Sequence, residues 1–308
     1  MKACQKVCVL MSTYNGEQYI AQQLESILNQ KDVEVYIIIR DDGSCDKTVS
    51  IIRDYQKKYL DKIELVEGEN AGVQKSFSKL INMAKDKPFD YFAFADQDDK
   101  WLNEKLITAV NILKDKSFDL PQLYFSNLCA ADDKLNELGN IYSANSVIMQ
   151  KKGALTRNFA YGCTCVFNKK AVEMYAKNYN ARMWMHDYWL YLICLYIGEV
   201  YYDNTSYILY RQHSNNTVGY KHGITQIIRR KLKSFSLLRE HPRENMAVDL
   251  YNTFEKELSD DDKVILKNFF SYRRNIFSRI KAAFDKDYLI YGKLQNIFLR
   301  IRFIIGAV

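Results

Sequence analysis

The sequence predicts an α/β fold with a mostly parallel sheet, and two observations support that prediction. Short runs rich in β-branched and aromatic residues alternate with segments whose apolar residues recur at helical spacing. Polar, acid-rich loops follow three of the predicted strands. Strands that alternate with helices form right-handed βαβ units, which bring the carboxyl ends of parallel strands to one edge of the sheet. Ligands bind at that edge in open α/β sheets, so we expect a binding site there.

The first half of the chain supplies the first two of these units. An apolar run at 7–12 predicts a strand, a turn follows at 13–16, and apolar residues then recur at helical spacing over 20–28. The run at 33–39 predicts a second strand, and Asp41 and Asp42 lie at its carboxyl end. Ser44 or Asp46 can cap the helix that follows.

Two further strands are expected at 63–66 and 91–95. Between them, a turn at 69–73 leads into a helix that carries apolar residues from Phe77 to Ala84. The run at 91–95 is apolar throughout, which suits a strand buried on both faces, and it stops at four residues of which three are acidic.

Asp96 and Asp98 stand one residue apart in the loop after this fourth strand. In an irregular loop their oxygen atoms can converge on one hard cation, which can in turn hold a diphosphate. A solvated acidic turn is the alternative explanation of such a cluster. The chain has neither a Gly-x-Gly-x-x-Gly turn nor a P-loop, so a bound metal is expected to hold the phosphates.

Four motifs in the first half of the chain carry a family resemblance. They are Met11-Ser12-Thr13-Tyr14-Asn15, Asp41-Asp42-Gly43-Ser44-x-Asp46-x-Thr48, Asn70-x-Gly72 and Asp96-Gln97-Asp98-Asp99-x-Trp101. In this order and spacing they resemble the inverting glycosyltransferases of family 2, which have the GT-A fold. Gln97, Asp99 and Trp101 resemble the bacterial rhamnosyltransferase-like branch more than the cellulose or chitin synthases.

The resemblance implies a GT-A fold, Rossmann-like with helices flanking the sheet, and a set of site residues. Those expected to bind the nucleotide sugar are Thr13, Tyr14, Asn15, Asp41, Asp42, Asn70, Gly72, Asp96, Gln97 and Arg211. Asp98, Asp96 and His213 are expected to hold Mn²⁺ or Mg²⁺. The implied donor is a dTDP- or UDP-sugar, and the implied acceptor is a glycan, free or lipid-linked.

The second half of the chain is expected to shape the acceptor side. Strands are predicted near 123–126, 161–168 and 207–212, and a loop is predicted at 132–141. Gly162, near the start of the second of these strands, allows backbone to approach a sugar or marks a β-bulge.

Asp187 opens an apolar helix, where an acidic residue is commonly a simple cap. The family resemblance matches it to the Asp of a Glu-Asp motif, which acts as general base, although His186 stands where the family has Glu. Arg211 lies near the end of the last predicted strand and His213 directly follows it; the two resemble a polar cluster near the diphosphate. The alternative interpretation is that both are simply exposed loop residues.

Composition sets further bounds. The chain has 308 residues, 48% of them hydrophobic, which excludes disorder. Seven scattered cysteines argue for a reducing compartment, and no apolar run is long enough to span a bilayer. We therefore expect a cytoplasmic protein, with possible peripheral contact at the inner face of the plasma membrane.

Charge divides the chain. Residues 1–220 carry a net charge of −1, whereas residues 221–308 carry +8. We expect a catalytic domain at 1–220, with a nucleotide-sugar half at about 1–130 and an acceptor half at about 131–220, followed by a basic amphipathic helical extension. Such helices bind membrane surfaces or nucleic acid, pack on a domain, or form a dimer. The lipid-linked acceptor that the family resemblance implies favours membrane contact, and no nucleic acid is expected.

Two other functions fit parts of this pattern. A sugar-phosphate nucleotidyltransferase shares α/β architecture and metal-binding carboxylates, but the glycine- and lysine-rich triphosphate signature is missing near the N-terminus. A non-enzymatic module could bind anionic lipid or RNA through residues 221–308. The expected function remains transfer of a sugar, with L-rhamnose suggested by resemblance, to a glycan hydroxyl in cell-surface polysaccharide synthesis.

Overall fold

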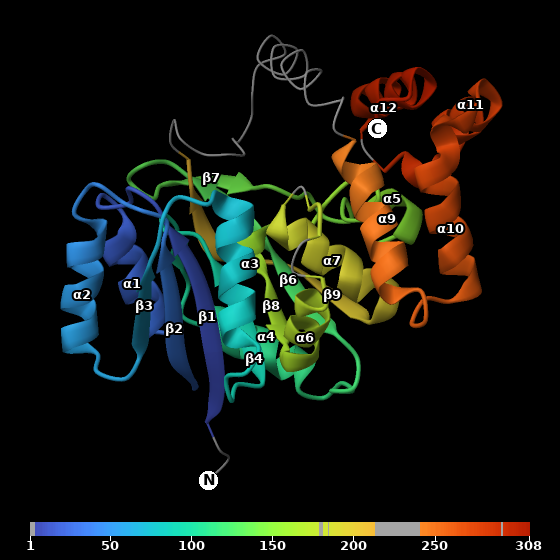
Figure 1. The fold of residues 1–308 in the computed structure, drawn as a ribbon. Helices are drawn as coiled ribbons and strands as arrows, with labels where there is room; N and C mark the ends of the chain where they lie inside the picture. Colours follow the sequence, from blue (N-terminus) through green and yellow to red (C-terminus); the bar gives the residue numbers. More distant parts are fainter. Residues whose placement is uncertain (1–3, 179–180, 184, 213–240, 291) are drawn as a thin grey trace.

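The computed structural model describes residues 4–178, 181–183, 185–212, 241–290 and 292–308. Its centre is a nine-stranded sheet with the strand order β3-β2-β1-β4-β8-β6-β9-β5, and β7 pairs with β6 outside this path (Figure 1). Helices cover both faces of the sheet. The architecture is the α/β fold that the alternating pattern predicts.

The N-terminal half of the sheet is parallel, as expected. Its strands are β1 (Gln5–Thr13), β2 (Val33–Asp41), β3 (Ile63–Glu67) and β4 (Tyr91–Ala95). In this register Met11 of β1 lies opposite both Ile39 of β2 and Ala95 of β4. The carboxyl ends of these strands therefore meet at one edge, and the loops after β1, β2 and β4 lie close together.

Four helices follow these strands, and the first three were predicted from helical spacing, whereas the fourth was not. They are α1 (Ile20–Leu28), α2 (Thr48–Lys58), α3 (Val73–Ala84) and α4 (Lys105–Leu113). Alternate residues of each strand point to opposite layers: Val9 packs with α1, α2 and α4, whereas Leu10 packs with α3 on the other face. Because side chains alternate between the two faces of the sheet, the strands contribute to two hydrophobic cores, one on each face.

The C-terminal half of the sheet is mixed. Its strands are β5 (Lys100–Trp101), β6 (Gln122–Ala131), β7 (Glu137–Asn140), β8 (Val166–Asn168) and β9 (Glu199–Arg211). β8 runs antiparallel to both β4 and β6, whereas β9 is parallel to β6 and antiparallel to β5. Strand β8 thereby joins the two halves.

Several expectations for this half are wrong in detail. The strands predicted near 123–126 and 207–212 are longer than expected and span Gln122–Ala131 and Glu199–Arg211. The strand predicted at 161–168 begins only at Val166, because residues Gly162–Thr164 form a turn of 3₁₀-helix. The Gly162 N–H donates to the Asp187 carboxylate at 2.9 Å rather than to a neighbouring strand. The loop predicted at 132–141 contains β7, which pairs with β6.

Helices α5 (Lys151–Ala154), α6 (Lys169–Ala176) and α7 (His186–Ile197) complete the acceptor half. Four more follow within residues 241–290 and 292–308: α9 (Pro242–Phe254), α10 (Asp260–Ser271), α11 (Ile276–Phe284) and α12 (Lys293–Ile305). The C-terminal helices share a hydrophobic core with α7, where Trp189 lies 6.4 Å from Phe254 between ring centroids. They are also tied to α5 by Lys151–Asp262 and Lys152–Asp285 ion pairs.

The predicted boundary at residue 220 lies outside the described residues. Within the described part, the C-terminal helices pack on the acceptor half, which is one of the roles that their amphipathic pattern allows. None of the described helices combines the length and the apolar character needed to cross a bilayer.

Candidate active site

A cavity of about 300 Å³ opens at the carboxyl edge of the parallel strands. Loops after β1, β2 and β4 line it, together with the starts of α3 and α7 and the turn at 161–163. Of the residues predicted to form the site, the cavity brings together Thr13, Tyr14, Asp42, Asn70, Gly72, Asp96, Gln97, Asp98 and Asp187. These residues come from five separate segments of the chain.

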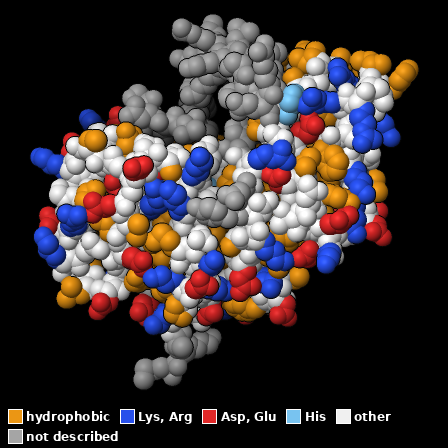
Figure 2. Space-filling view, in the orientation of Figure 1, with side chains coloured by type: hydrophobic (Ala, Val, Ile, Leu, Met, Phe, Trp, Pro, Cys, Tyr) orange, Lys and Arg blue, Asp and Glu red, His pale blue; other side chains and the backbone are white. Residues whose placement is uncertain are grey.

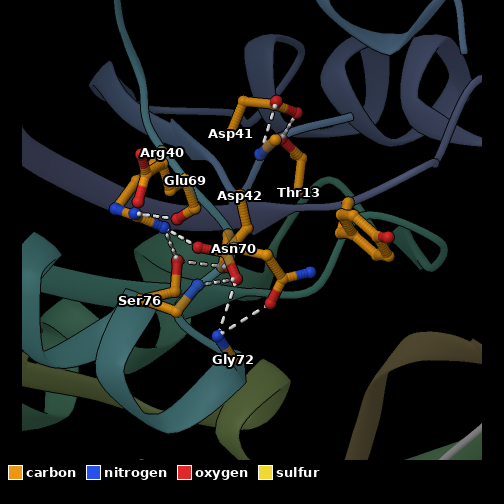
Figure 3. A network of polar contacts seen from close by, with 12 residues as sticks. Thr13, Arg40, Asp41, Asp42, Glu69, Asn70, Gly72 and Ser76 are labelled. Carbon is orange, nitrogen blue, oxygen red and sulfur yellow. Dashed lines mark hydrogen bonds and ion pairs between the residues drawn. The ribbon is translucent and has the colours of Figure 1, made fainter. Parts of the chain in front are cut away.

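Asp42 organises the loop that leads into α3 (Figure 3). Its carboxylate accepts the N–H groups of Ala71 and Gly72 at 3.0 and 2.9 Å and pairs with the buried guanidinium of Arg40. Burial alone would raise the pKa of Asp42, but these hydrogen bonds and the charge of Arg40 lower it overall. Asp42 therefore stays ionised and holds the loop against β2.

Asp41 and Asn15 lie outside the cavity lining. Asp41 accepts hydrogen bonds from Thr13 Oγ1 at 2.9 Å and from Ser44 N–H and Oγ at 2.8 and 2.6 Å. Asn15 Oδ1 accepts the Cys45 N–H at 2.9 Å. Both side chains fasten the loop after β1 to the loop after β2, so any part that they play in nucleotide binding stays a prediction.

Gln97 joins the loop after β4 to the loop after β1. Its amide accepts the Tyr14 N–H at 2.9 Å and donates to the Tyr14 carbonyl at 3.0 Å. A Cβ atom at Gly16 would lie 2.3 Å from Gln97 Oε1, so a larger residue there would push the Gln97 amide out of these two hydrogen bonds. The side chain thereby fixes the two loops that form one wall of the cavity.

The acidic loop after β4 concentrates uncompensated negative charge. Burial, followed by the charges of Asp98 and Asp187, raises the pKa of Asp96 to about 7. Asp99 is fully buried, and burial together with Asp98 and Asp96 raises its pKa well above the usual range. Its Oδ2 has no hydrogen-bond partner among the described residues. A bound cation would stabilise the ionised form of these carboxylates and displace the protons that they otherwise bind.

The donor atoms suit a divalent metal ion. Ligand atoms of Asp96, Asp99 and Cys163 all lie within 4.8 Å of one another, and Asp98 lines the adjacent cavity. Carboxylate oxygens are the ligands of Mg²⁺ and Mn²⁺, whereas a thiol favours softer metals. Asp98 is not part of this group, so Asp98 as a ligand stays a prediction, and His213, the third predicted ligand, lies outside the described residues.

Arg211 is bonded to the acidic loop but does not line the cavity. Its Nε donates to the Asp98 carbonyl at 2.9 Å, and its remaining guanidinium nitrogens bond the Asp133 carbonyl and Gln22. The guanidinium also lies 4.6 Å from the centroid of the Tyr19 ring. Arg211 does not line the cavity, so its predicted contact with the diphosphate remains untested by this geometry.

Asp187 lies in the first turn of α7 and lines the same cavity. Its two oxygens accept the N–H groups of Gly162 at 2.9 Å and Tyr188 at 2.6 Å. Burial raises the pKa of Asp187 to about 7, against the lowering effect of these hydrogen bonds. A carboxylate with that pKa can accept a proton from an acceptor hydroxyl near neutral pH.

His186 has a different environment although it is the adjacent residue. Its ring stacks on Phe77 with centroids 3.7 Å apart and meets Phe94 edge-on at 4.9 Å. Burial lowers the pKa of His186 to about 3, and neither ring nitrogen bonds a described residue. The imidazole is therefore neutral at physiological pH and a much weaker base than Asp187.

Several lining residues were missed by sequence reasoning, among them Phe77, Cys163, Met185 and Tyr210. All are apolar or weakly polar, so no local pattern distinguishes them from core residues. Lys105 does not line the cavity and was not singled out either; it is buried, with its Nζ 3.7 Å from the Trp101 ring centroid. Burial lowers its pKa to about 8.

Comparison with known proteins places this geometry in a family. The family model for glycosyl transferase family 2 matches residues 8–175. The chain is 30% identical to the dTDP-rhamnosyl transferase RfbG of Shigella flexneri, over 94% of this chain and 100% of that protein. It is also 33% identical to the putative teichuronic acid biosynthesis glycosyltransferase TuaG of Bacillus subtilis, over 36% of this chain and 43% of that protein.

Solved structures share the fold. The structure of S. aureus TarS residues 1–349 covers 99% of this chain and 81% of its own, with a TM-score of 0.58 and 16% identity. The same protein in complex with UDP-GlcNAc covers 98% of this chain and 91% of its own, with a TM-score of 0.55 and 14% identity. The match between family model, relative and fold shows that this chain belongs to glycosyltransferase family 2.

Proposed function

We propose that this glycosyltransferase transfers L-rhamnose from dTDP-rhamnose to a hydroxyl of a glycan, with inversion at the anomeric carbon. The observation that carries the donor assignment is the 30% identity to a dTDP-rhamnosyl transferase over that protein's whole length. The family assignment also favours sugar transfer over the nucleotidyltransferase and the non-enzymatic module.

The cavity supports a nucleotide-sugar donor. It lies at the carboxyl edge of parallel strands, where nucleotides bind in α/β sheets. TarS, whose fold this chain shares, has been solved with UDP and with UDP-GlcNAc. We infer that the base and ribose lie against the loops of Thr13, Asp42 and Asn70, and that the diphosphate lies toward Asp96 and Asp98.

Asp187 is the proposed general base. Its carboxylate takes the proton from the acceptor hydroxyl as that oxygen attacks the anomeric carbon. The bond from the anomeric carbon to the diphosphate oxygen breaks on the opposite side, and its electron pair leaves with the nucleoside diphosphate. One displacement of this kind inverts the configuration, and it needs no covalent intermediate.

Asp96 and Asp98 would hold Mn²⁺ or Mg²⁺, with His213 as the further proposed ligand. A bound divalent cation supplies positive charge that offsets the charge on the departing diphosphate. The raised pKa of Asp96 fits this assignment, because a cation at the site would stabilise the ionised carboxylate.

The proposed acceptor is a lipid-linked glycan on the way to a cell-surface polysaccharide. That acceptor would place the enzyme in the cytoplasm at the inner face of the plasma membrane, as a peripheral protein. The basic charge of residues 221–308 supports such a location, since bacterial and plasma-membrane inner surfaces carry anionic lipid.

A donor screen tests the proposal. Thermal unfolding is measured with dTDP-, UDP- and GDP-sugars in the presence and absence of Mn²⁺, because a ligand that binds the native state raises its melting temperature. We expect the largest metal-dependent rise with dTDP-rhamnose, and its loss in Asp98→Ala but not in the surface control Asp54→Ala. A larger rise with a UDP- or GDP-sugar, followed by turnover of that donor, would replace the donor assignment.

A further inference from the structure

The outer sides of α11 and α12 expose an unusual amount of apolar surface. Nine of the 19 large hydrophobic side chains that are exposed among the described residues lie on these two helices. Figure 2 shows hydrophobic side chains gathered at the upper right edge, over α11 and α12. Contiguous exposed apolar surface marks an interaction site more often than scattered single residues do.

Helix α12 is apolar on two sides. On the inner side, Phe303 packs against the rings of Phe269, Tyr272 and Tyr288. The outer side carries the exposed residues Leu294, Ile297, Ile301, Ile304 and Ile305. Intervals of three and four place these five on one face of the helix. The inner face of α12 packs in the hydrophobic core, whereas its outer face contacts solvent.

Helix α11 extends this surface. Ile276, Ile280 and Phe284 are one turn apart, and Phe277, with 81% of its side chain exposed, lies beside them. Ala282 and Ala283 are buried on the inner side of the same helix. Because α11 packs directly against α12, the exposed side chains of the two helices form a surface that we call the α11–α12 apolar face.

The charge around this face is strongly positive. Residues 272–308 contain eight Lys and Arg but only two Asp or Glu. Both acids, Asp285 and Asp287, bond Lys152 at 2.9 and 3.0 Å, so they point toward α5. The cations Arg274, Lys281, Lys286 and Lys293 make no ion pair with another described residue.

Apolar residues together with positive charge distinguish between two possible binding partners of this face, a second copy of the chain and an anionic lipid surface. A second copy of the chain would bring two basic surfaces of the same sign together, which opposes association. An anionic lipid surface offers both a negative headgroup layer for the cations and an apolar interior for the isoleucines and phenylalanines. An apolar stripe with cations beside it is the pattern of a helix that lies in the plane of a membrane interface.

We propose that the α11–α12 apolar face docks this protein on an anionic phospholipid surface. The two helices form the end of the molecule opposite α2 (Figure 1), and α9 joins their bundle to α7, which carries Asp187. The membrane would thus contact the acceptor half rather than the nucleotide half. This orientation rests on the proposed lipid-linked acceptor, whereas the docking itself depends only on the surface.

Vesicle sedimentation tests the docking on the full chain. Wild type is compared with Phe277→Ser/Ile297→Ser/Ile301→Ser and with a control of similar exposure, Leu60→Ser/Leu120→Ser/Leu138→Ser. Vesicles of phosphatidylglycerol and phosphatidylethanolamine are compared with vesicles of phosphatidylcholine alone. We expect wild type and the control to bind the anionic vesicles, and the test variant to lose binding by about 100-fold or more.

Salt and mass measurements complete the test. Lys281→Gln/Lys293→Gln should weaken binding to anionic vesicles, and added salt should reproduce that effect. Equal vesicle binding by the test and control variants would overturn the proposal. So would a wild-type dimer, seen by light scattering, that becomes monomeric in the test variant. Turnover of a soluble acceptor by the test variant separates this outcome from failure of the proposed transferase reaction.

Discussion

At the residue scale, two adjacent side chains at the start of α7 respond to burial in opposite directions. Burial disfavours the charged form of each, so the pKa of Asp187 rises to about 7 while the pKa of His186 falls to about 3. The sequence supports the choice of Asp187 as the base but leaves His186 as a competitor. The competitor is disfavoured by Phe77 and Phe94, whose contact with His186 no local pattern reveals.

Replacement of Asp187 by Asn should separate these two residues. A general base contributes roughly 10² to 10⁴ in rate, so we expect Asp187→Asn to reduce turnover by about that factor. Donor affinity should change little, because the base acts on the acceptor. His186→Gln serves as the matched comparison and should retain far more activity. Near-full turnover in Asp187→Asn with loss in His186→Gln would reverse the assignment.

The pH dependence of transfer follows from the same environment. Asp187 must be ionised to accept a proton, so the rate should rise with pH through about 7 and level off above it. If the base were an aspartate with an ordinary pKa, the rate would rise near pH ~4 instead. The measurement is the turnover rate from acid to neutral pH with saturating donor and metal. A rate that stays constant well below neutral pH would show that no group with a raised pKa controls the reaction.

The chemistry of the acidic loop was only partly visible in the sequence. Spacing identifies Asp96 and Asp98, because two carboxylates one residue apart after a buried strand are a recognisable pattern. Asp99 and Cys163 could not be found in the same way, since 64 residues separate them and only the turn at 162–164 brings them together. Arg211, expected near the diphosphate, does not line the cavity and donates to the Asp98 carbonyl, so its expected role stays a prediction.

At the scale of elements, the parallel half of the sheet could be read from periodicity because each of its strands and helices has a uniform pattern. The prediction for 161–168 is wrong at its start because a distant carboxylate, Asp187, accepts the Gly162 N–H. Local sequence cannot report such a partner. The His186 ring explains why glycine lies here, because a Cβ atom at this position would be only 2.8 Å from His186 Nε2.

Gly162→Ala should therefore impair catalysis. The added methyl group cannot fit unless the His186 ring or the start of α7 moves, and a shift of the base by even a fraction of an ångström lowers the rate. Gly292→Ala is a suitable control, since its Cβ would meet only the flexible end of Gln295. We expect loss of turnover in Gly162→Ala with retained cooperative unfolding. Equal turnover in both variants would show that the turn adapts without moving the base.

At the scale of the whole molecule, the sequence separates a neutral part from a basic part, but it does not show how they are joined. Charge is a property of the surface, and it says little about the shared core beneath. Met246, Leu250 and Phe254 of α9 are buried in the same cluster as Trp189 and Tyr188 of α7. Helices that follow the predicted domain boundary thus complete the hydrophobic core of the part that precedes it.

Truncation after residue 220 should consequently destabilise the catalytic part rather than release it as an independent domain. The α7 surface that α9 covers includes Trp189, and full burial of one large apolar side chain contributes about 1.5 to 3 kcal/mol. Exposure of several such side chains is comparable to the whole stability of a domain, about 5 to 15 kcal/mol. We expect the truncated chain to aggregate or to lose cooperative thermal unfolding.

The variant Phe277→Ser/Ile297→Ser/Ile301→Ser, altered only on the exposed face, should unfold cooperatively near the wild-type temperature. A soluble 1–220 chain that melts like the full protein would instead establish the predicted division into two domains.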